Sequence, residues 1–312
     1  MSRTAYNLGP GCVEYNSLKF YSKDDIIVTE ALETENEISS VYGKIGERIN
    51  DRHFEITFTP IGELESLTKY YPYQGSKIGD DIFPATDLPL IVWGLDGTKR
   101  TYNAAAMTKM PDLDLSTGKS LFGQVTFLCL GSGDTAWSGA NSLVTHATAQ
   151  TFPTTTLDTA TLFRNAYTGV WGAKAAPWNA LKTIDGFKVG FNLQLQDKSV
   201  DNYGVVQKCI AGLEVTLTFD PVGVLEADVL SAIGYQGAGA ARGMNLSGLG
   251  ANMVITGGTT PNLLTATIKG AAIKDYKLTY GFKTPRIKDV VMVAQNTVLG
   301  GTLGDYFTIG LS

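Results

Sequence analysis

The sequence predicts a mainly β protein that consists of two tandem copies of one domain, each with one short α-helix. Three observations predict this fold class: apolar and polar residues alternate along several segments, the two halves of the chain match each other in order, and each half carries one apolar stripe at helical spacing. The chain has 312 residues, of which 44% are hydrophobic and 18% charged. It is therefore long enough to bury one large core or two cores of ordinary size.

The two halves of the chain match at a nearly constant shift. Thr57–Glu65 pairs with Thr218–Glu226 at a shift of 161, with six identities in nine positions. Further pairs follow in the same order with small, loop-sized changes of shift: Tyr73–Gly75 with Tyr235–Gly237 at 162, and Ala105–Met107 with Ala271–Ile273 at 166. A colinear series of this kind indicates a tandem duplication.

The repeat divides the chain into four parts. Residues 1–130 form the first expected β domain and residues 162–295 the second. Between them, residues 131–161 are rich in Thr and Ala and have the composition of a linker or extension. Residues 296–312 form a C-terminal tail to which the sequence assigns no role.

Strand signals dominate each copy. From Phe187 to Leu195, apolar residues alternate with polar residues and glycine, which is the period of a half-buried strand. In the first copy, Ile26, Val28 and Leu32 are expected at the buried places. Further strands are expected at residues 54–58, 90–93, 124–128, 215–219, 253–255 and 290–293, with an Asp96-Gly97 hairpin turn after the second of them.

One short helix is expected in each copy after the shared Pro-x-Gly sequence. Apolar or packing residues recur there at helical spacing and would face a sheet. These residues are Leu64, Leu67, Thr68 and Tyr71 in the first copy, and Leu225, Val229, Ala232 and Ile233 in the second.

The first-copy strand also carries Glu33, Glu35 and Glu37 at outward positions, about 7 Å apart along one face. Like charges that close together need water, so this face is expected on the outer surface or in a water-filled channel. Residues 37–48 and 199–208 then join two strands in each copy and are long for a hairpin connection. They are interpreted either as surface loops or as arms that fold onto a neighbouring subunit.

Charge and cysteine content exclude several classes of protein. Residues 1–150 carry 19 acidic and 12 basic side chains, a balance of −7, whereas residues 151–312 carry 11 and 13, a balance of +2. No basic stripe for nucleic acid is formed, and unlike halves of neighbouring subunits can attract each other. Cys12, Cys129 and Cys209 have no metal or disulfide spacing and are expected to be free thiols. The chain has no apolar run of about 18 residues and no N-terminal apolar segment, so we expect a soluble protein that is made inside the cell and does not span a membrane.

Candidate chemistry is sparse. His53 and His146 share no motif with a nucleophile or another ligand, and the carboxylate pairs, such as Asp112 with Asp114, are expected in turns or on the surface. The glycine-rich run 234–243 follows a helix instead of opening one, so it is interpreted as a loop in which Arg242 is a plausible intersubunit charge. We therefore expect no catalytic residue, no metal and no cofactor.

Several soft motifs together resemble tail tube proteins of long-tailed bacteriophages and prophages. They are Gly9-Pro10-Gly11, the Tyr42-Gly43 segment before the Phe54 to Pro60 strand, and the Lys109–Leu113 run, on a duplicated β domain with one helix. The resemblance implies a β-sandwich or small-barrel core in each copy. It also implies a structural, non-enzymatic virion protein that stacks as rings into a hollow tail tube through which DNA passes. For two tandem domains, it implies a trimeric, pseudo-hexameric ring, with a hexamer as the alternative.

The resemblance also implies roles for particular residues. The family's inter-strand arm, which contacts the adjacent ring, corresponds here to residues 37–48 and 199–208. The lumen lining corresponds to the outward positions of the strand before each arm. The expected arm or intersubunit residues are Ser39, Ser40, Tyr42, Lys44, Ile45, Tyr203, Val205, Val206 and Arg242, and the expected lumen residues are Glu33, Glu35, Gln194 and Gln196.

The expected partners are copies of the chain itself and other tail proteins at the tube ends, with DNA passing through without specific binding and no membrane. The expected location is the virion tail, after synthesis in the host cytoplasm. A tail hub or tube-initiating ring is the alternative within this class. From a different class, a carbohydrate-binding β-sandwich module would use Trp137, Trp171 and Trp178 as stacking platforms.

Overall fold

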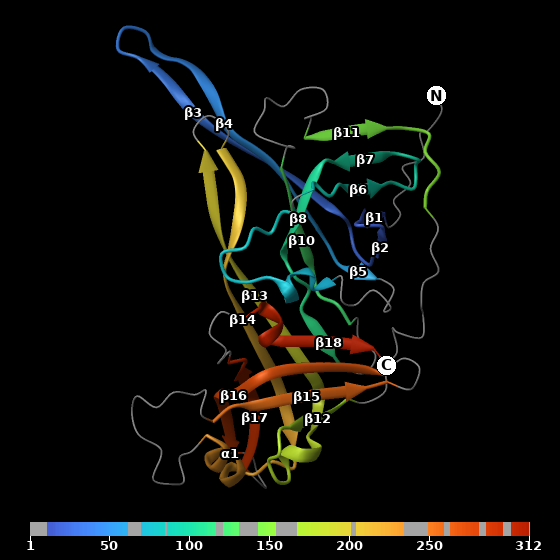
Figure 1. Ribbon diagram of the computed structural model, residues 1–312, viewed down its shortest axis with the longest axis vertical. Helices are drawn as coiled ribbons and strands as arrows, with labels where there is room; N and C mark the ends of the chain where they lie inside the picture. The colour runs from blue at the N-terminus through green and yellow to red at the C-terminus, as the bar shows by residue number, and fades with distance from the viewer. Residues whose placement is uncertain are drawn as a thin grey trace.

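The computed structural model describes residues 11–61, 70–84, 86–116, 121–130, 143–153, 167–200, 204–233, 249–258, 263–280, 285–295 and 301–311. The molecule is mainly β, as predicted, and includes a sheet that curls into a half-barrel. Figure 1 shows an elongated molecule with the turn between β3 (Ile27–Ser39) and β4 (Gly43–Phe58) at one end of the long axis and α1 (Glu226–Ala232) at the other.

The first sheet has the strand order β11-β7-β6-β1-β2-β5. Its strands are β1 (Cys12–Tyr15), β2 (Leu18–Ser22), β5 (Pro60–Ile61), β6 (Leu90–Trp93), β7 (Lys99–Tyr102) and β11 (Val144–Ala147). The expected Asp96-Gly97 turn joins β6 to β7, with Gly97 at φ +81° and the Asp96 carboxylate accepting the Thr98 backbone N–H at 2.9 Å. Part of the stretch expected as a linker is thus a sheet strand, β11, which pairs with β7.

Two further sheets complete the fold. The second has the order β3-β4-β10-β8, with β8 at Ala104–Lys109 and β10 at Val125–Leu130. The third has the order β12-β15-β16-β17-β14-β13-β9, and β18 pairs with β16 beside this path. Its strands are β9 (Leu113–Leu115), β12 (Thr168–Trp171), β13 (Lys182–Val200), β14 (Gly204–Val222), β15 (Ala251–Gly257), β16 (Leu264–Tyr280), β17 (Pro285–Val293) and β18 (Phe307–Leu311).

The pairing order in the first half of the chain recurs in the second half. The neighbours β3-β4-β10-β8 correspond to β13-β14-β17-β16, and β1-β6-β7-β11 correspond to β12-β15-β16-β18. The long hairpins also break register at equivalent positions. The β3–β4 pair is irregular between Glu33 and Thr34, and the β13–β14 pair is irregular between Gln194 and Leu195, 161 residues further on.

The second-copy helix is present as α1, and its Val229 and Ala232 are buried as predicted. The expectation for Leu225 is wrong, since this side chain is 67% exposed. Leu225 is the N-cap, with extended backbone, so it precedes the first helical turn that faces the sheet. The first-copy helix was expected at residues 64–71, of which 64–69 lie outside the described residues, while Tyr71 is buried beside the short 3-10 turn η2 (Pro72–Gly75).

The predicted strands are all present, but two expectations about them need correction. Residues 37–48 and 199–208 are not long loops: β3 ends at Ser39 and β4 begins at Gly43, so the described connection is three residues long. Gly43, at φ +72°, permits this tight turn, and β-branched Ile38 and Ile45 favour extended backbone on either side of it. Leu32 is 50% exposed instead of buried, because it lies opposite Arg52, beyond the Phe54–Phe58 stretch where β10 pairs with β4.

One continuous hydrophobic cluster joins the two halves. The first half contributes β9, which pairs with β13 through Leu115 opposite Phe187. Gly186, at φ +80°, permits this approach, because a Cβ there would lie 2.5 Å from the Leu115 carbonyl oxygen. The C-terminal tail joins the second half through β18, which pairs with β16. Its short turn η7 (Leu303–Asp305) also contacts the first half, because Leu303 N donates to Ser76 O at 2.8 Å.

Candidate assembly surface

The β3–β4 hairpin is a two-stranded ribbon that projects from the body (Figure 1). β3 pairs with β4 over its whole length, and no described strand pairs with its other edge. β4 pairs with β10 only between Phe54 and Phe58. The edge of β4 from Gly43 to His53 therefore has no partner strand among the described residues. Unpaired strand edges are sites at which another chain adds.

The tip of this ribbon is apolar and exposed. Ile38, Val41 and Tyr42 are 74%, 77% and 82% exposed, and Ile45 is also exposed. The Ser39 hydroxyl oxygen accepts the backbone N–H groups of Val41 and Tyr42 at 3.2 and 3.4 Å, which holds the turn in shape. The expected arm residues Ser39, Ser40, Tyr42, Lys44 and Ile45 thus lie together at the tip.

The two faces of the ribbon differ. One face continues the core side of β3 and β4 beyond the body, and it carries Leu32, Ile38 and Ile49, each at least half exposed. Its charges are paired within the ribbon, Arg52 Nε with Glu30 at 2.6 Å and Lys44 with Glu47. The other face has the positions of Glu33, Glu35 and Glu37, of which Glu35 and Glu37 are exposed and the Glu33 side chain lies outside the description.

The β13–β14 ribbon has the same design but is partly covered. Gln194 and Gln196 are exposed on one face, while Phe191 is buried on the other and lies 4.9 Å from the Tyr71 ring. The first half supplies this cover. Of the remaining expected arm residues, Val205 and Val206 belong to β14 without described side chains, and Tyr203 and Arg242 lie outside the described residues.

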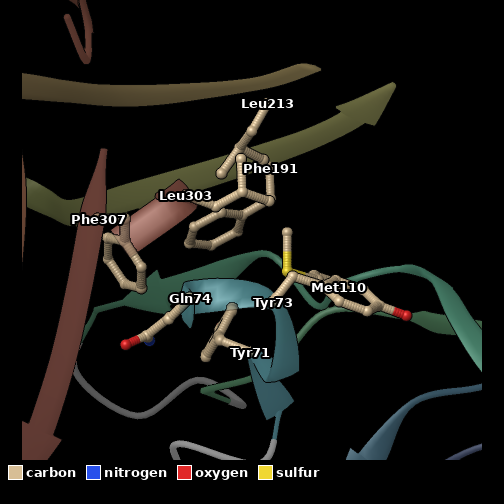
Figure 2. A pocket seen from close by; sticks show the side chains of 8 residues that line it. All are labelled: Tyr71, Tyr73, Gln74, Met110, Phe191, Leu213, Leu303 and Phe307. Carbon is tan, nitrogen blue, oxygen red and sulfur yellow. The ribbon is translucent and has the colours of Figure 1, made fainter. Parts of the chain in front are cut away.

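The junction between the halves is tightly packed. Figure 2 shows four first-half side chains facing four second-half side chains around a cavity of about 10 Å³, roughly the smallest space that holds a water molecule. The first four are Tyr71, Tyr73, Gln74 and Met110, and the second four are Phe191, Leu213, Leu303 and Phe307. Burial raises the pKa values of the Tyr71 and Tyr73 hydroxyls well above the ordinary value, and these hydroxyls donate to the Pro111 and Met107 carbonyl oxygens.

A larger cleft of about 510 Å³ lies where the halves meet at β9 and β13. Asp112, Asp114 and Lys188 are among its polar lining groups. Asp112 Oδ1 accepts the Phe191 backbone N–H at 3.0 Å, and Asp114 accepts the Ser116 hydroxyl. Asp112 thus links the two halves from an exposed position, whereas Asp114 lies on β9 and its hydrogen bond stays within the first half.

The tryptophans expected as sugar platforms are not available as such. Trp171 is fully buried and Trp178 is 4% exposed, with the two rings packed edge to face at 5.0 Å. Trp137 lies outside the described residues. Aromatic platforms for sugars need an exposed ring face, so Trp171 and Trp178 do not serve as the platforms expected in the carbohydrate-binding alternative.

The groups with reactive potential are dispersed. The three cysteines are free and buried, and burial raises the pKa of the Cys129 thiol far above its ordinary value. His53 lies within β4 instead of at its start, and His146 lies on β11. Among the described residues, no group of three or more His, Cys, Asp or Glu side chains could hold a metal ion. No helix in the described part of the chain is long and apolar enough to cross a membrane.

No protein-family model matches this chain, and no curated protein shows significant similarity to it.

Proposed function

We propose that this chain is a structural subunit that joins copies of itself into rings, and that the rings stack into the hollow tail tube of a long-tailed bacteriophage. The observation that carries the proposal is the β3–β4 ribbon, with its exposed apolar face and its unpaired edge. A two-stranded ribbon is marginal in water on its own. An apolar face and a free edge on such a ribbon call for a partner chain.

The proposed subunit consists of two tandem β-sandwich or barrel-like domains, residues 1–130 and 162–295. The matching strand order and the matching register breaks of the two long hairpins support the duplication. Two similar domains in one chain favour a trimeric ring with six-fold pseudo-symmetry, and a hexamer is the alternative. A head-to-tail contact between unlike halves, with a rotation that closes, would give such a ring.

The proposed arm and lumen lie on different parts of the ribbons. The tip around Tyr42 would contact the adjacent ring, where burial of apolar area stabilises stacking at about 25 cal/mol per Å² before ordering costs. Glu33 and Glu35, with Gln194 and Gln196, would face the lumen. Acidic and neutral side chains do not bind the phosphates of DNA, which suits a conduit without specific binding.

In this proposal the chain is non-enzymatic, needs no cofactor and meets other tail proteins at the tube ends. It would be made in the host cytoplasm and located in the virion tail. Electron microscopy of the purified protein over a range of concentrations tests the idea. Stacked rings of open-ended length support a tube subunit, whereas closed single rings that do not stack would indicate a hub or tube initiator. A protein that stays monomeric at high concentration would contradict both.

A further inference from the structure

The edge of β14 that faces away from β13 is hydrogen-bonded to a segment of the first half of the same chain. Gly79 N donates to Ile210 O at 2.7 Å, Ile210 N donates to Asp80 O at 2.9 Å, and Ile82 N donates to Lys208 O at 3.0 Å. In Figure 1 this cyan segment passes beside the yellow β13–β14 ribbon. The first half therefore adds a short strand-like piece to the ribbon of the second half.

The equivalent edge of β4 has no strand paired with it among the described residues, although β14 lies close to β4. Thr34 opposite Ile49 and Asn36 opposite Glu47 repeat, at a shift of 161, Leu195 opposite Ile210 and Asp197 opposite Lys208. The same backbone groups of β4 therefore point outward at these positions. The exposure of the two equivalent isoleucines differs accordingly: Ile49 is 52% exposed, whereas Ile210 is 1% exposed.

The charged residues on the two sides of this contact both have the opposite sign at the equivalent positions of the other half of the sequence. Within the chain, a segment bearing Asp80 and Asp81 lies along the edge that carries Lys208. On β4 the residue equivalent to Lys208 is Glu47. In the second copy of the sequence, the residue equivalent to Asp80 at the local shift of 162 is Arg242. An acidic segment beside Lys208 thus becomes a basic segment for Glu47. Each of these two edge charges also has an ion pair within its own ribbon, Lys208 with Asp197 and Glu47 with Lys44.

We propose that the edge of β4 from Glu47 to Ile49 is the docking site for the second half of a neighbouring copy of this chain, in the way that β14 receives the first half of its own chain. The docking segment is the stretch around Arg242, which lies outside the described residues. This inference rests on the proposed self-assembly and names its in-ring contact. The contact is head-to-tail, and with a rotation that closes it gives a ring in which intrachain and interchain junctions alternate. The reversed charges favour this pairing and disfavour β4 binding the Asp80 segment of another copy.

Charge reversal in the full-length protein tests the contact. Glu47→Arg and Arg242→Glu are each expected to raise the concentration at which half of the protein is assembled by about tenfold or more, as measured by sedimentation velocity. The double variant is expected to return to within about threefold of the wild type, because the pair is restored with opposite sign. Asp185→Arg, at an exposed carboxylate of β13 outside this contact, is the matched control and should assemble normally.

A second variant separates assembly from folding. Ile49→Ser should weaken assembly as strongly as the charge reversals while leaving the thermal unfolding midpoint unchanged, because Ile49 is half exposed in the subunit. Tubes that form normally from both single charge variants would overturn the docking site and leave the proposed function standing. If the double variant rescues the two single charge variants but the protein forms only closed rings that never stack, the docking site is supported and the tube is contradicted. A wild-type protein that remains monomeric would overturn both.

Discussion

At the scale of single residues, Trp171 illustrates how the core of the second half is specified. Its indole Nε1 donates to the carbonyl oxygens of Ala251 at 3.1 Å and Ala271 at 2.8 Å. Trp171→Phe removes this donor and leaves a void, so we expect the free energy of unfolding to fall by about 2–4 kcal/mol in urea titrations. Trp93→Phe, at a half-buried ring on β6, is the control and should cost less than about 1 kcal/mol. Equal losses in the two variants would contradict the core role of Trp171.

A second residue-scale prediction concerns alkaline pH. Burial first, and then the nearby Glu14 carboxylate, raises the pKa of the Cys12 thiol from 9.0 to about 11. Burial, with Cys129 adding to it, raises the pKa of Tyr15 from 10.0 to about 12. Both raised values favour the neutral form in the folded state. This contribution to stability is fully present below the unfolded-state pKa and is lost as the pH rises through the folded-state pKa.

We therefore expect the free energy of unfolding to fall as the pH rises from about 9 to about 11 for Cys12, followed by the Tyr15 contribution between about 10 and 12. Chemical denaturation at a series of pH values measures this slope. Cys12→Ala should flatten the first part of the decline relative to the wild type. An unchanged slope in that variant would assign the alkaline loss to other groups.

At the scale of elements, the ribbon tip is separable from the fold. Replacing Ser39–Gly46 by Asn-Gly closes the ribbon with a short loop between Asn36 and Glu47 and removes Val41, Tyr42 and Ile45, all exposed. We expect a folded subunit with a thermal midpoint close to that of the wild type, because no buried side chain is lost, but loss of stacked tubes in electron microscopy. Leu95→Ser, at an exposed apolar residue of the β6–β7 turn, is the control. Tubes of wild-type length after the replacement would refute the arm assignment.

At the scale of the whole molecule, the sign of the charge along the lumen decides whether DNA is held. Glu35→Lys combined with Gln194→Lys would place cations at two exposed positions of the proposed lumen. Assembled tubes of this variant should retain DNA in a salt-dependent way, because lysine side chains that contact phosphates release the counterions of the DNA. Wild-type tubes, which have no lysine at these two positions, should not retain it. Filter binding of labelled DNA at several salt concentrations measures the difference. Equal retention by the two tubes would place these residues away from the lumen.

Much of the fold follows from local sequence patterns. Alternation from Phe187 to Leu195 predicts β13 because one face of the strand is buried or half-buried over those residues, and Asp96-Gly97 predicts its turn because the backbone needs a positive φ there. The long loops expected at residues 37–48 and 199–208 could not be corrected from sequence. Their mixed polarity suits a loop as well as a ribbon that is exposed on both faces, and only partner strands distinguish the two.

The candidate assembly surface depends partly on local sequence patterns and partly on contacts between residues that are far apart in the sequence. The free thiols and the exposed Glu35 and Glu37 of β3 could be deduced from the sequence, because they rest on residue identity and spacing. The cover of β14 by Gly79–Ile82, and its absence on β4, could not, since Ile49 and Ile210 are the same residue type in the same pattern. Their exposure differs because long-range packing brings the first half onto one ribbon and leaves the other free, and contacts between residues more than a hundred positions apart leave no periodic trace in the chain.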